Sequence, residues 1–541
     1  MARNIADLFE HAVDAVPERL ALQVGDRRLT FAELEAQTNQ LAHFLASRGV
    51  KAGDHVGIFA KNGVEHVVAM MAIYKLRAVS INVNYRYVER ELSHIIDNSD
   101  MVALVVERCY APLVAKVAAK HALLRLIVVA EDGTDPASPE GDASAFDGIA
   151  WADAVAGQRT ERDFEERSDD DLYIVYTGGT TGFPKGVMWR HEDWWRVLGG
   201  GIDFMTGELQ EEFDQSRKAV EGAPMVTLPI SPIMHGGAQA GLLMHLFGGH
   251  ATILVPTFDA EEIWQIIDRD QVQLIFITGD AMARPLIEAF ENGSYDGSSL
   301  IAVASSAAIF SKPVKERWMK AFPNTFFTDS IGASETGFQG TALQDASTLG
   351  SDGPVVAMGP GTVVLDLDNT LLDPVKDVGK VGKTARSGNV PLGYYKDEAK
   401  SRATFLEIDG VRYSVPGDFA RIEEGNRITL LGRGSNCINT GGEKVFSEEV
   451  EMALKGHPDV YDALVVGVPD ERFGSAVAAV VQPREGAQPT LFELQAYLRD
   501  HLSGYKLPRT LVLVDEIPRH ATGKADYPTA RRLAASVLDP A

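Results

Sequence analysis

The sequence has 541 residues, of which 45% are hydrophobic and 23% are charged, the balance of a folded globular protein. A chain of this length exceeds what one hydrophobic core usually organises, so two or more domains are expected. With 51 basic and 76 acidic residues, the formal net charge is −25, which argues against a general binder of nucleic acids or of anionic membranes.

The cysteine content and the N-terminal residues predict a cytoplasmic location. Cys109 and Cys437 are the only cysteines and lie far apart in the sequence, which favours a reducing compartment. The N-terminal segment MARNIADLFEHAVDAVPERL is charged and lacks the apolar stretch of a signal peptide. No run of about 18 apolar residues occurs, so no membrane-spanning helix is expected.

Helical and strand-like segments alternate from the N-terminus. TFAELEAQTNQLAHFLASRGV predicts a helix from an N-cap at Thr30 to near Gly49, because its apolar residues recur at helical spacing. HVGIFA predicts a short buried strand, and VEHVVAMMAIYKL predicts the next helix. Further apolar runs of strand length are MVALVV, LRLIVVA, LYIVYT, ATILVP and QLIFIT. This alternation predicts an α/β fold with mainly parallel sheets.

The pattern changes after about Gly350. Glycine, aspartate and short strands in VRYSVPGDFARIEEGNRITLLGRGSN predict a small β-rich part. A helix from about Ser447, the strands DALVVGVP and AVAAVVQP, the helix TLFELQAYLRDHL and the strand RTLVLVDEIP then predict an α+β module. We therefore expect an N-terminal domain over 1–432, a hinge over 433–436 and a C-terminal domain over 437–541.

Segment 176–186, YTGGTTGFPKG, has the composition of a phosphate-binding loop but not the spacing G-x-x-x-x-G-K-[ST]. Pro184 next to Lys185 disfavours the helix that follows the usual nucleotide loop, so we expect a connection between two strands. Glycines let backbone amides approach an anion, while threonine hydroxyls and the lysine add donors and charge. The predicted phosphate contacts are Thr177, Gly178, Gly179, Thr180, Thr181, Gly182 and Lys185. On spacing alone, a surface turn rich in glycine and threonine remains the alternative.

The longer segment YTGGTTGFPKGVMWRH resembles the signature loop of the adenylate-forming acyl-CoA synthetases. Segments resembling the other motifs of this superfamily follow in the same order along almost the whole chain. SSAAI (305–309) would line the adenine site and SIGASETG (330–337) the phosphate side, while PGDFA (416–420) and LGRGSN (431–436) would contact the ribose. The nucleotide contacts that the resemblance implies are Ser306, Ala307, Ala308, Ser330, Ile331, Gly332, Ser334, Asp418 and Arg433.

The resemblance also implies three catalytic groups. Glu335 would bind Mg²⁺, Lys185 would hold the β- and γ-phosphates, and Lys524 in IPRHATGKADY would stabilise the adenylation transition state. The expected cofactors and cosubstrates are ATP, Mg²⁺ and CoA. The expected reaction joins a carboxylic acid to CoA through an acyl-adenylate and releases AMP and pyrophosphate. The expected fold has a large N-terminal domain and a small mobile C-terminal domain.

The second half-reaction and the acid have their own implied contacts. The pantetheine arm of CoA would meet INTGGEKVFSEEVE through Gly441, Gly442 and Lys444. SPIMHGG and TGDAMARP would line the acyl pocket through His235, Gly279 and Met282. Finer similarity to actinobacterial steroid side-chain CoA ligases, which also take long-chain fatty acids, predicts a bulky apolar acid. The family also suggests a homodimer.

Several alternatives remain open from the sequence. The substrate could be a medium-chain, aryl or sulfur-containing acid, or the chain could be an adenylation domain serving a carrier protein, or a catalytically inactive binding protein. VVLDLDNTLLD (363–373) matches the nucleophile motif of haloacid-dehalogenase-type phosphatases through Asp366, Asp368 and Thr370. Its place inside the predicted β-rich part favours a strand followed by an acidic turn.

Some residues depart from the family pattern or invite another interpretation. Ile331 stands where an aromatic residue usually stacks on adenine, and Ser435 where the hinge usually has Asp or Lys. Ser447 replaces a usual proline and is expected to be a helix N-cap. His191 and its neighbours Trp189, Trp194 and Trp195 are expected to form core or a lid rather than a ligand cage.

Overall fold

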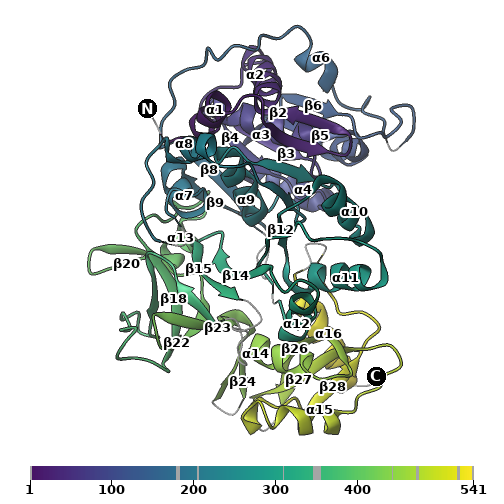
Figure 1. Ribbon diagram of the computed structural model, residues 1–541, viewed down its shortest axis with the longest axis vertical. Coiled ribbons are helices and arrows are strands. Elements are labelled where there is room, and N and C mark those ends of the chain that lie inside the picture. Colours follow the sequence, from purple (N-terminus) through teal and green to yellow (C-terminus); the bar gives the residue numbers. More distant parts are fainter. Residues whose placement is uncertain are drawn as a thin grey trace.

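The computed structural model describes residues 3–139, 141–177, 183–203, 206–308, 310–344, 355–440, 443–470, 474–520 and 524–538. Two large sheets with their helices form the N-terminal part, and a smaller unit of helices and strands follows toward the C-terminus (Figure 1). Within the described residues, the two large sheets have 15 and 8 strands, and the C-terminal unit contributes sheets of 2 and 3 strands.

The 8-stranded sheet carries the predicted phosphate loop. Its strands are parallel except at one edge, where β9 and β19 run antiparallel to their neighbours. In order across the sheet they are β19 (Gly393–Tyr394), β9 (Lys185–Arg190), β8 (Leu172–Thr177), β4 (Val79–Asn82), β3 (His55–Phe59), β5 (Met101–Glu107), β6 (Leu126–Ala130) and β7 (Gly148–Ala150).

The 15-stranded sheet has a parallel half followed by an antiparallel half. The parallel neighbours are β1 (Leu20–Val24), β11 (Ala251–Leu254), β10 (Val226–Pro229), β12 (Leu274–Ile277), β13 (Ala302–Ser306) and β14 (Phe326–Ala333), and β2 (Arg27–Thr30) pairs antiparallel at the β1 edge. The antiparallel half contains β15 (Gly337–Gln344), β16 (Val355–Met358), β17 (Thr362–Leu365), β18 (Val381–Ser387), β20 (Phe405–Ile408), β21 (Val411–Ser414), β22 (Asp418–Glu423) and β23 (Arg427–Arg433). This half is the β-rich part that the sequence predicts.

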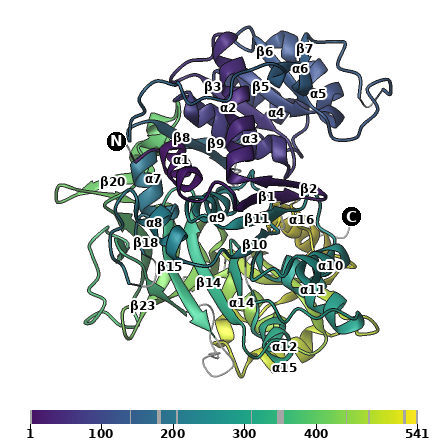
Figure 2. The ribbon, with the colours of Figure 1, turned by 45° about the horizontal axis from the view of Figure 1, so that its top comes forward.

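Helices cover the two sheets and fill the space between them, as Figure 2 shows for α1, α3 and α9. The helices of the N-terminal part are α1 (Ile5–Ala15), α2 (Phe31–Ser47), α3 (Val64–Lys75), α4 (Glu89–Asn98), α5 (Ala111–Val117), α6 (Trp151–Val155), α7 (His191–Leu198), α8 (Asp214–Glu221), α9 (Gly236–Phe247), α10 (Ala260–Asp270), α11 (Gly279–Asn292), α12 (Lys312–Ala321) and α13 (Glu398–Thr404). No helix in the described ranges combines the length and the apolar character needed to cross a membrane.

The largest hydrophobic core joins both large sheets. It contains residues of β1 and β11 from one sheet, residues of β3, β5, β8 and β9 from the other, and the apolar faces of the helices between them. Trp189, Trp194 and Trp195 belong to this core and are fully buried, as is His191. The prediction that this cluster is core rather than a ligand cage is therefore confirmed.

The predicted elements of the N-terminal part are confirmed with small changes in their ends. At α2, the Thr30 hydroxyl accepts from the Glu33 amide at 3.2 Å, and the Glu33 carboxylate accepts from the Thr30 amide at 2.8 Å. This reciprocal capping box satisfies amides that have no partner within the helix, which explains why the helix begins where the sequence predicts.

The C-terminal unit contains α14 (Ser447–Lys455), α15 (Leu491–Leu498) and α16 (Tyr527–Leu538), and the strands β24 (Ile438–Thr440), β25 (Glu443–Val445), β26 (Val460–Asp470), β27 (Gly474–Pro483) and β28 (Thr510–Leu513). All of these except the β24–β25 hairpin and α16 match segments that the sequence predicts. The segment 433–436, predicted as a hinge, spans the end of β23 and a short 3₁₀ helix over Gly434–Asn436. The domain boundaries remain a prediction.

The assignment of Ser447 as an N-cap is wrong. Phe446 occupies the N-cap position of α14, and Ser447 is the first helical residue. The Ser447 hydroxyl donates instead to the Asn436 carbonyl at 2.9 Å, so it ties the start of the helix to the end of the predicted hinge. The first helical position suits the proline that relatives usually have there, because its amide has no partner within the helix.

The phosphatase-like motif forms a turn. Asp366 directly follows β17, and its carboxylate accepts from the amides of Asp368 at 2.9 Å and Thr370 at 2.8 Å. A carboxylate used in this way stabilises the turn between β17 and β18. The motif is therefore the acidic turn that its position in the sequence favours.

Candidate active site

The predicted site residues gather where parallel strands end. β10, β12 and β13 are neighbours in the 15-stranded sheet and run in the same direction. The segment with His235 follows β10, Gly279 follows β12, and Ser306 is the last residue of β13. Because the carboxyl ends of parallel strands lie at one edge of a sheet, the segments predicted to hold acid and adenine face a common space.

Asn82 joins this edge to the corresponding edge of the 8-stranded sheet. It is the last residue of β4, and its side-chain amide donates to the carbonyls of Tyr176 at 3.1 Å and Met234 at 2.6 Å. The Asn82 side-chain oxygen also accepts from the Tyr176 amide at 2.8 Å. One buried side chain thus holds the strand that leads into the phosphate loop against the segment that carries His235.

The two ends of the phosphate loop lie side by side. Thr177 ends β8 and Lys185 begins β9, and the two residues are paired across these antiparallel strands. This confirms the predicted strand-to-strand connection. The predicted contacts Gly178, Gly179, Thr180, Thr181 and Gly182 lie outside the described residues.

Lys185 is held by residues far away in the sequence. Its ammonium forms an ion pair with Asp397 and lies 6.0 Å from the centre of the Tyr394 ring. The hydrogen bond from Lys185, with a second from the Lys400 amide, holds the pKa of Asp397 below its ordinary value. Asp397 is also the N-cap of α13, so its carboxylate is fixed by the helix as well as by the lysine.

Glu335 lies in the turn between β14 and β15 and is joined to the same cluster. The Tyr394 hydroxyl donates to its Oε1 at 2.8 Å. The turn is fixed on two sides, because the Trp189 indole donates to the Ser334 carbonyl at 3.0 Å and the Ser414 hydroxyl donates to the Glu335 carbonyl at 2.5 Å. The structure therefore brings the predicted metal ligand and the predicted phosphate lysine to one tyrosine, Glu335 at its hydroxyl and Lys185 near its ring.

The segment predicted to line the adenine site ends in strained backbone. Ala307 has φ +66°, in the left-handed region that alanine rarely adopts, and the Ala308 amide donates to the Ser306 carbonyl at 2.9 Å. Such strain at the end of a parallel strand is typical of functional sites, where the surrounding structure holds it in place.

The segment predicted to line the phosphate side, SIGASETG (330–337), is tightly packed. The Ser330 hydroxyl donates to Thr341 at 3.1 Å, and Ile331 packs against a small core formed by the β-rich part. A Cβ atom on Gly332 would lie 2.3 Å from the Gly337 carbonyl, so only glycine fits at this position. That Ile331 supports adenine by apolar contact remains a prediction.

The two residues predicted at the ribose are neighbours across two strands. Asp418 begins β22 and Arg433 ends β23, and their backbones are paired in these antiparallel strands. The pairing fits the predicted role of both residues at one sugar, and it lies immediately before the predicted hinge.

His235 is the N-cap residue of α9, and its ring is mostly buried. Its Nε2 atom has no hydrogen-bond partner among the described residues. Burial, together with the positive charges of Lys524 and Arg86, lowers the pKa of His235 to about 4. The ring is therefore neutral at pH 7 and can offer Nε2 to a ligand.

The other predicted acyl-pocket residues lie on α11. Gly279 begins this helix with φ +49°, and Met282 lies one turn later with its sulfur 3.3 Å from the Thr278 amide. Met282 also packs against the core formed by α10, α11 and α12. Ser231 and Thr278, at the ends of neighbouring strands, share a hydrogen bond of 2.7 Å. Their roles in a pocket remain predictions.

Lys524 comes from the C-terminal unit, and its positive charge contributes to the lowered pKa of the His235 ring. Of the predicted CoA contacts, Gly441 and Gly442 lie outside the described residues, and Lys444 lies in β25 with a side chain that is outside them too.

The sequence did not point to Tyr394, Asp397 or Asn82. Tyr394 and Asp397 belong to GYYKDE, in which no periodic or motif signal connects them to a loop about 200 residues earlier. Asn82 ends β4, a strand that was not predicted from the sequence, so its bridging amide could be recognised only once both sheets were placed.

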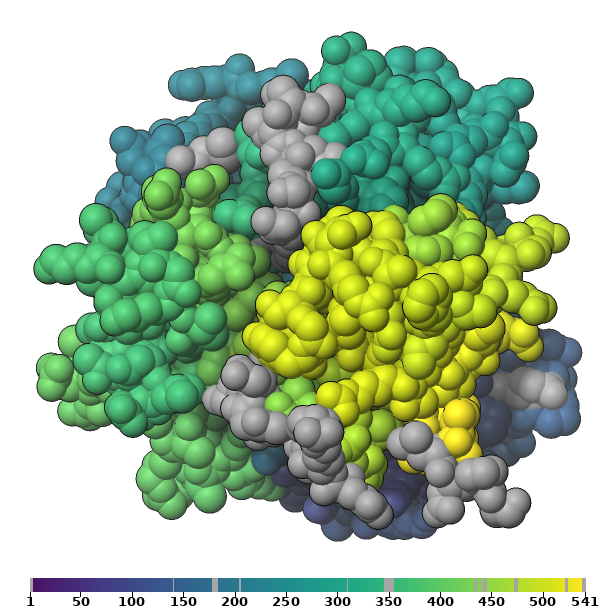
Figure 3. Space-filling model, turned by 90° about the horizontal axis from the view of Figure 1, so that it is seen from below, coloured from purple at the N-terminus to yellow at the C-terminus, as the bar shows by residue number. Residues whose placement is uncertain are grey.

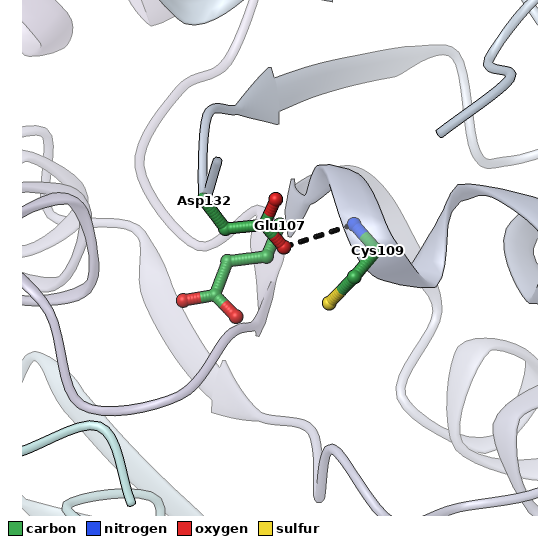
Figure 4. A group of neighbouring side chains, drawn as sticks. All are labelled: Glu107, Cys109 and Asp132. Carbon is green, nitrogen blue, oxygen red and sulfur yellow. Dashed lines mark hydrogen bonds between the residues drawn. The ribbon is translucent and has the colours of Figure 1, made fainter. Parts of the chain in front are cut away.

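A separate cluster lies at the carboxyl ends of β5 and β6 (Figure 4). Glu107, Cys109 and Asp132 each offer one atom that could bind a metal, and these three atoms lie within 4.8 Å of one another. The Cys109 amide donates to Asp132 at 3.0 Å. Burial raises the pKa of the Cys109 thiol to about 12 and that of Glu107 to about 7. A neutral thiol and a half-protonated carboxyl are poor ligands for a cation.

Comparison with known proteins agrees with this geometry. The model of the AMP-binding enzyme family matches residues 9–395, and that of the AMP-binding enzyme C-terminal domain matches residues 449–524. The chain is 54% identical to a 3-oxocholest-4-en-26-oate–CoA ligase of Rhodococcus rhodochrous over 98% of this chain and 96% of the relative. It is 52% identical to a medium/long-chain-fatty-acid–CoA/3-oxocholest-4-en-26-oate–CoA ligase of Mycobacterium tuberculosis (strain CDC 1551 / Oshkosh), with the same coverage.

Solved structures show the same fold. The crystal structure of the anthranilate CoA ligase AuaEII in complex with anthranoyl-AMP superposes with a TM-score of 0.83 at 22% identity, over 99% of this chain and 98% of the other. ATP-bound MatB from Rhodopseudomonas palustris superposes with a TM-score of 0.83 at 24% identity, over 99% of this chain and all of the other.

Proposed function

Because the chain belongs to the family of AMP-binding enzymes, we propose that it activates a carboxylic acid with ATP and transfers the acyl group to CoA. The enzyme is an acid–thiol ligase that uses ATP, Mg²⁺ and CoA. The observation that carries the assignment is that the models of the AMP-binding enzyme family and of its C-terminal domain match the chain over residues 9–395 and 449–524. The positive charge of Lys524, from the C-terminal unit, also contributes to the lowered pKa of His235, as suits a reaction in which two anions must meet.

The first half-reaction makes the carboxylate a good acyl donor. A carboxylate oxygen attacks the α-phosphorus of ATP, the bond from that phosphorus to the bridging oxygen breaks, and pyrophosphate leaves. Lys524 offsets the negative charge where the two reactants meet, and Lys185 holds the departing phosphates. Positioned charges of this kind stabilise the transition state because they are in place before the charge develops.

The residues around Glu335 fit a magnesium ion. Mg²⁺ prefers hard oxygen ligands, and the Glu335 carboxylate is held in place by the Tyr394 hydroxyl. Bound Mg²⁺ would neutralise part of the phosphate charge. Glu335 is the residue that would hold it, and Tyr394 orients that carboxylate.

The second half-reaction uses another orientation of the C-terminal unit. The thiol of CoA attacks the acyl carbon, and AMP leaves as the thioester forms. We assign the pantetheine contacts to Gly441, Gly442 and Lys444, which come to the site when the C-terminal domain (437–541) turns about the hinge (433–436). Asp418, Arg433 and the residues at the ends of β13 and β14 hold the nucleotide during both steps.

The acid we propose is bulky and apolar, either a steroid side-chain acid or a long-chain fatty acid. The relatives that are more than half identical over nearly their whole length bear the names of ligases for such acids. His235, Gly279 and Met282 line the acyl pocket in this proposal. The location is the cytoplasm, where both thiols stay reduced; the two cysteines form no disulfide.

The test is a mass-spectrometric assay of the purified chain with ATP, Mg²⁺, CoA and a panel of acids. The panel contains steroid side-chain acids, fatty acids of several lengths, aryl acids and sulfur-containing acids. We expect AMP and the acyl-CoA in equal amounts, with the highest kcat/KM for a steroid side-chain or long-chain acid. A preference for a short or aryl acid would overturn the substrate class, and ADP or the lack of any acid-dependent product would overturn the reaction.

A further inference from the structure

We propose that Arg284 of α11 and Tyr461 of β26 are positioning residues that hold the C-terminal domain where Lys524 faces His235. This proposal rests on the proposed function, because it assigns a task to the orientation that serves adenylation. The two residues lie on different sides of the predicted hinge, and we call their contact the α11–β26 latch. Figure 3 shows the yellow C-terminal residues lying directly against teal residues of the N-terminal part.

The latch consists of a buried cation and an aromatic ring. The guanidinium carbon of Arg284 lies 4.4 Å from the centre of the Tyr461 ring, and Arg284 is only 3% exposed. Its Nη1 atom is buried with no hydrogen-bond partner among the described residues, and its bond to Asp280 is long at 3.4 Å. The face of the tyrosine ring therefore supplies much of the stabilisation that this charge loses on burial.

Charges on both sides of the contact are complementary. Asp462, next to Tyr461, forms ion pairs with Lys455 at 2.9 Å and with Arg519 at 2.6 Å. Burial alone would lower the pKa of Lys455, but the carboxylates of Asp462 and of Asp280 on α11 raise it above its ordinary value. Asp280 thus attracts a cation of the C-terminal domain, while Arg284 contacts the neighbouring ring.

A second contact fixes the same orientation near the hinge. The Glu448 carboxylate of α14 rests on the backbone of Gly432, so closely that a Cβ atom at Gly432 would lie 2.0 Å from Glu448 Oε2. Gly432 has φ +109°, which favours glycine in any case. The C-terminal domain is therefore seated at two places, against α11 and against the last strand before the hinge.

The helix that carries the latch also carries the predicted acyl pocket. Gly279 and Met282 lie on the first turn of α11, Asp280 lies between them, and Arg284 follows on the next turn. A shift of this helix on binding the acid would move the latch as well.

The latch is weak enough to open between the half-reactions. It has one cation–ring contact, and Asp280 adds a long-range attraction to Lys455. The direct ion pairs of Asp462, with Lys455 and Arg519, lie within the C-terminal domain. Because the same domain must leave this orientation before the thioester forms, loss of the latch should slow only the first half-reaction.

The test compares Tyr461→Ala with Tyr461→Phe, which keeps the ring over Arg284 and removes only the hydroxyl. Acid-dependent exchange of pyrophosphate into ATP measures the first half-reaction, and formation of acyl-CoA from supplied acyl-adenylate measures the second. For Tyr461→Ala we expect about a tenfold loss in the first and a change below about twofold in the second, as a desolvated cation–π contact allows. Tyr461→Phe should stay within about twofold of the native enzyme in both.

A double-mutant cycle makes the test independent of a general loss of folding. If the latch is real, Arg284→Ala slows the first half-reaction as Tyr461→Ala does, and the double variant is no slower than either single variant. Three results would each overturn the latch. They are additive rate losses in the double variant, equal losses in both half-reactions, and an unchanged rate of pyrophosphate exchange in Tyr461→Ala. Failure of the native enzyme to catalyse any acid-dependent exchange would instead overturn the proposed function, so the two failures are distinguishable.

Discussion

The ammonium of Lys185 and the carboxylate of Asp397 form an ion pair although 212 residues separate them in the chain. β19 makes this possible, because it adds to the edge of β9 and carries the segment after it to the exit of the phosphate loop. The lysine that we propose for the phosphates of ATP therefore has a carboxylate partner within the chain, and we expect the phosphates to compete with it.

Removing the charge of Asp397 should strengthen ATP binding. In Asp397→Asn the lysine loses a competing anion, while asparagine still caps α13. The pair is partly exposed, so we expect a modest fall in the KM for ATP, about two- to fivefold. Steady-state kinetics with varied ATP measure this, and Lys185→Gln, which should raise the same KM, is the control. A higher KM in Asp397→Asn would show that the carboxylate positions the lysine for ATP.

Tyr394→Phe should weaken the use of Mg²⁺. The variant loses the hydroxyl that orients Glu335, and loss of such an outer partner typically weakens metal binding at least tenfold. We expect the half-saturating Mg²⁺ concentration to rise by about tenfold. The neighbouring Tyr395 offers a matched control, since its hydroxyl donates to Asp100 at the same 2.8 Å. An equal effect of Tyr395→Phe would contradict the assignment of Glu335.

Lys524→Ala should separate the two half-reactions. Losing one positioned charge at the reacting phosphate should slow adenylation by about 100- to 1,000-fold. Thioester formation from supplied acyl-adenylate should be largely spared. Both half-reactions are measured on the same preparation, and Lys376→Ala, at a lysine whose side chain is 83% exposed, controls for the loss of a charge. Comparable loss in both steps would rule out this role.

Acid should destabilise the fold through buried histidines. Burial lowers the pKa of His66 and of His245 to about 4 and that of His191 to about 3. Between pH 6.5 and about 4 the unfolded chain binds protons that these folded rings do not. The stability present above pH 6.5 is therefore lost as the pH falls, by up to about 1.4 kcal/mol per pH unit for each ring.

Chemical denaturation at pH 7, 6 and 5 measures this loss. His245→Gln removes one of the titrating rings, so its free energy of unfolding should depend less steeply on pH than that of the native chain. His501→Gln, at an exposed position, is the matched control. An unchanged slope in His245→Gln would show that this ring does not contribute.

The family and the fold class could be predicted from the sequence because their signals are local. Short apolar runs predict the strands, and the family that the motifs resemble is the one whose models match residues 9–395 and 449–524. The roles of the individual site residues remain predictions, although the structure brings Lys185 and Glu335 to one tyrosine and pairs Asp418 with Arg433.

The parts that escaped prediction depend on tertiary contacts or on weak local patterns. Tyr394 lies in a strand of two residues, which is too short to show a period. Its place near the phosphate loop is set by the pairing of this strand with β9. The last helix, α16, was not predicted from the sequence; it packs Ala530 and Ala534 against the strands of the C-terminal unit. α14 begins at Ser447 as predicted, but its N-cap is Phe446 rather than the good capping residue Ser447.

The division of the site among strand ends has an evolutionary consequence. The segments assigned to the acid follow β10 and β12, whereas those assigned to ATP follow β8, β13 and β14. Substitutions can accumulate at the first two strand ends while the nucleotide machinery stays under constraint. Such an arrangement lets gene duplication yield ligases for new acids without reinventing the adenylation step.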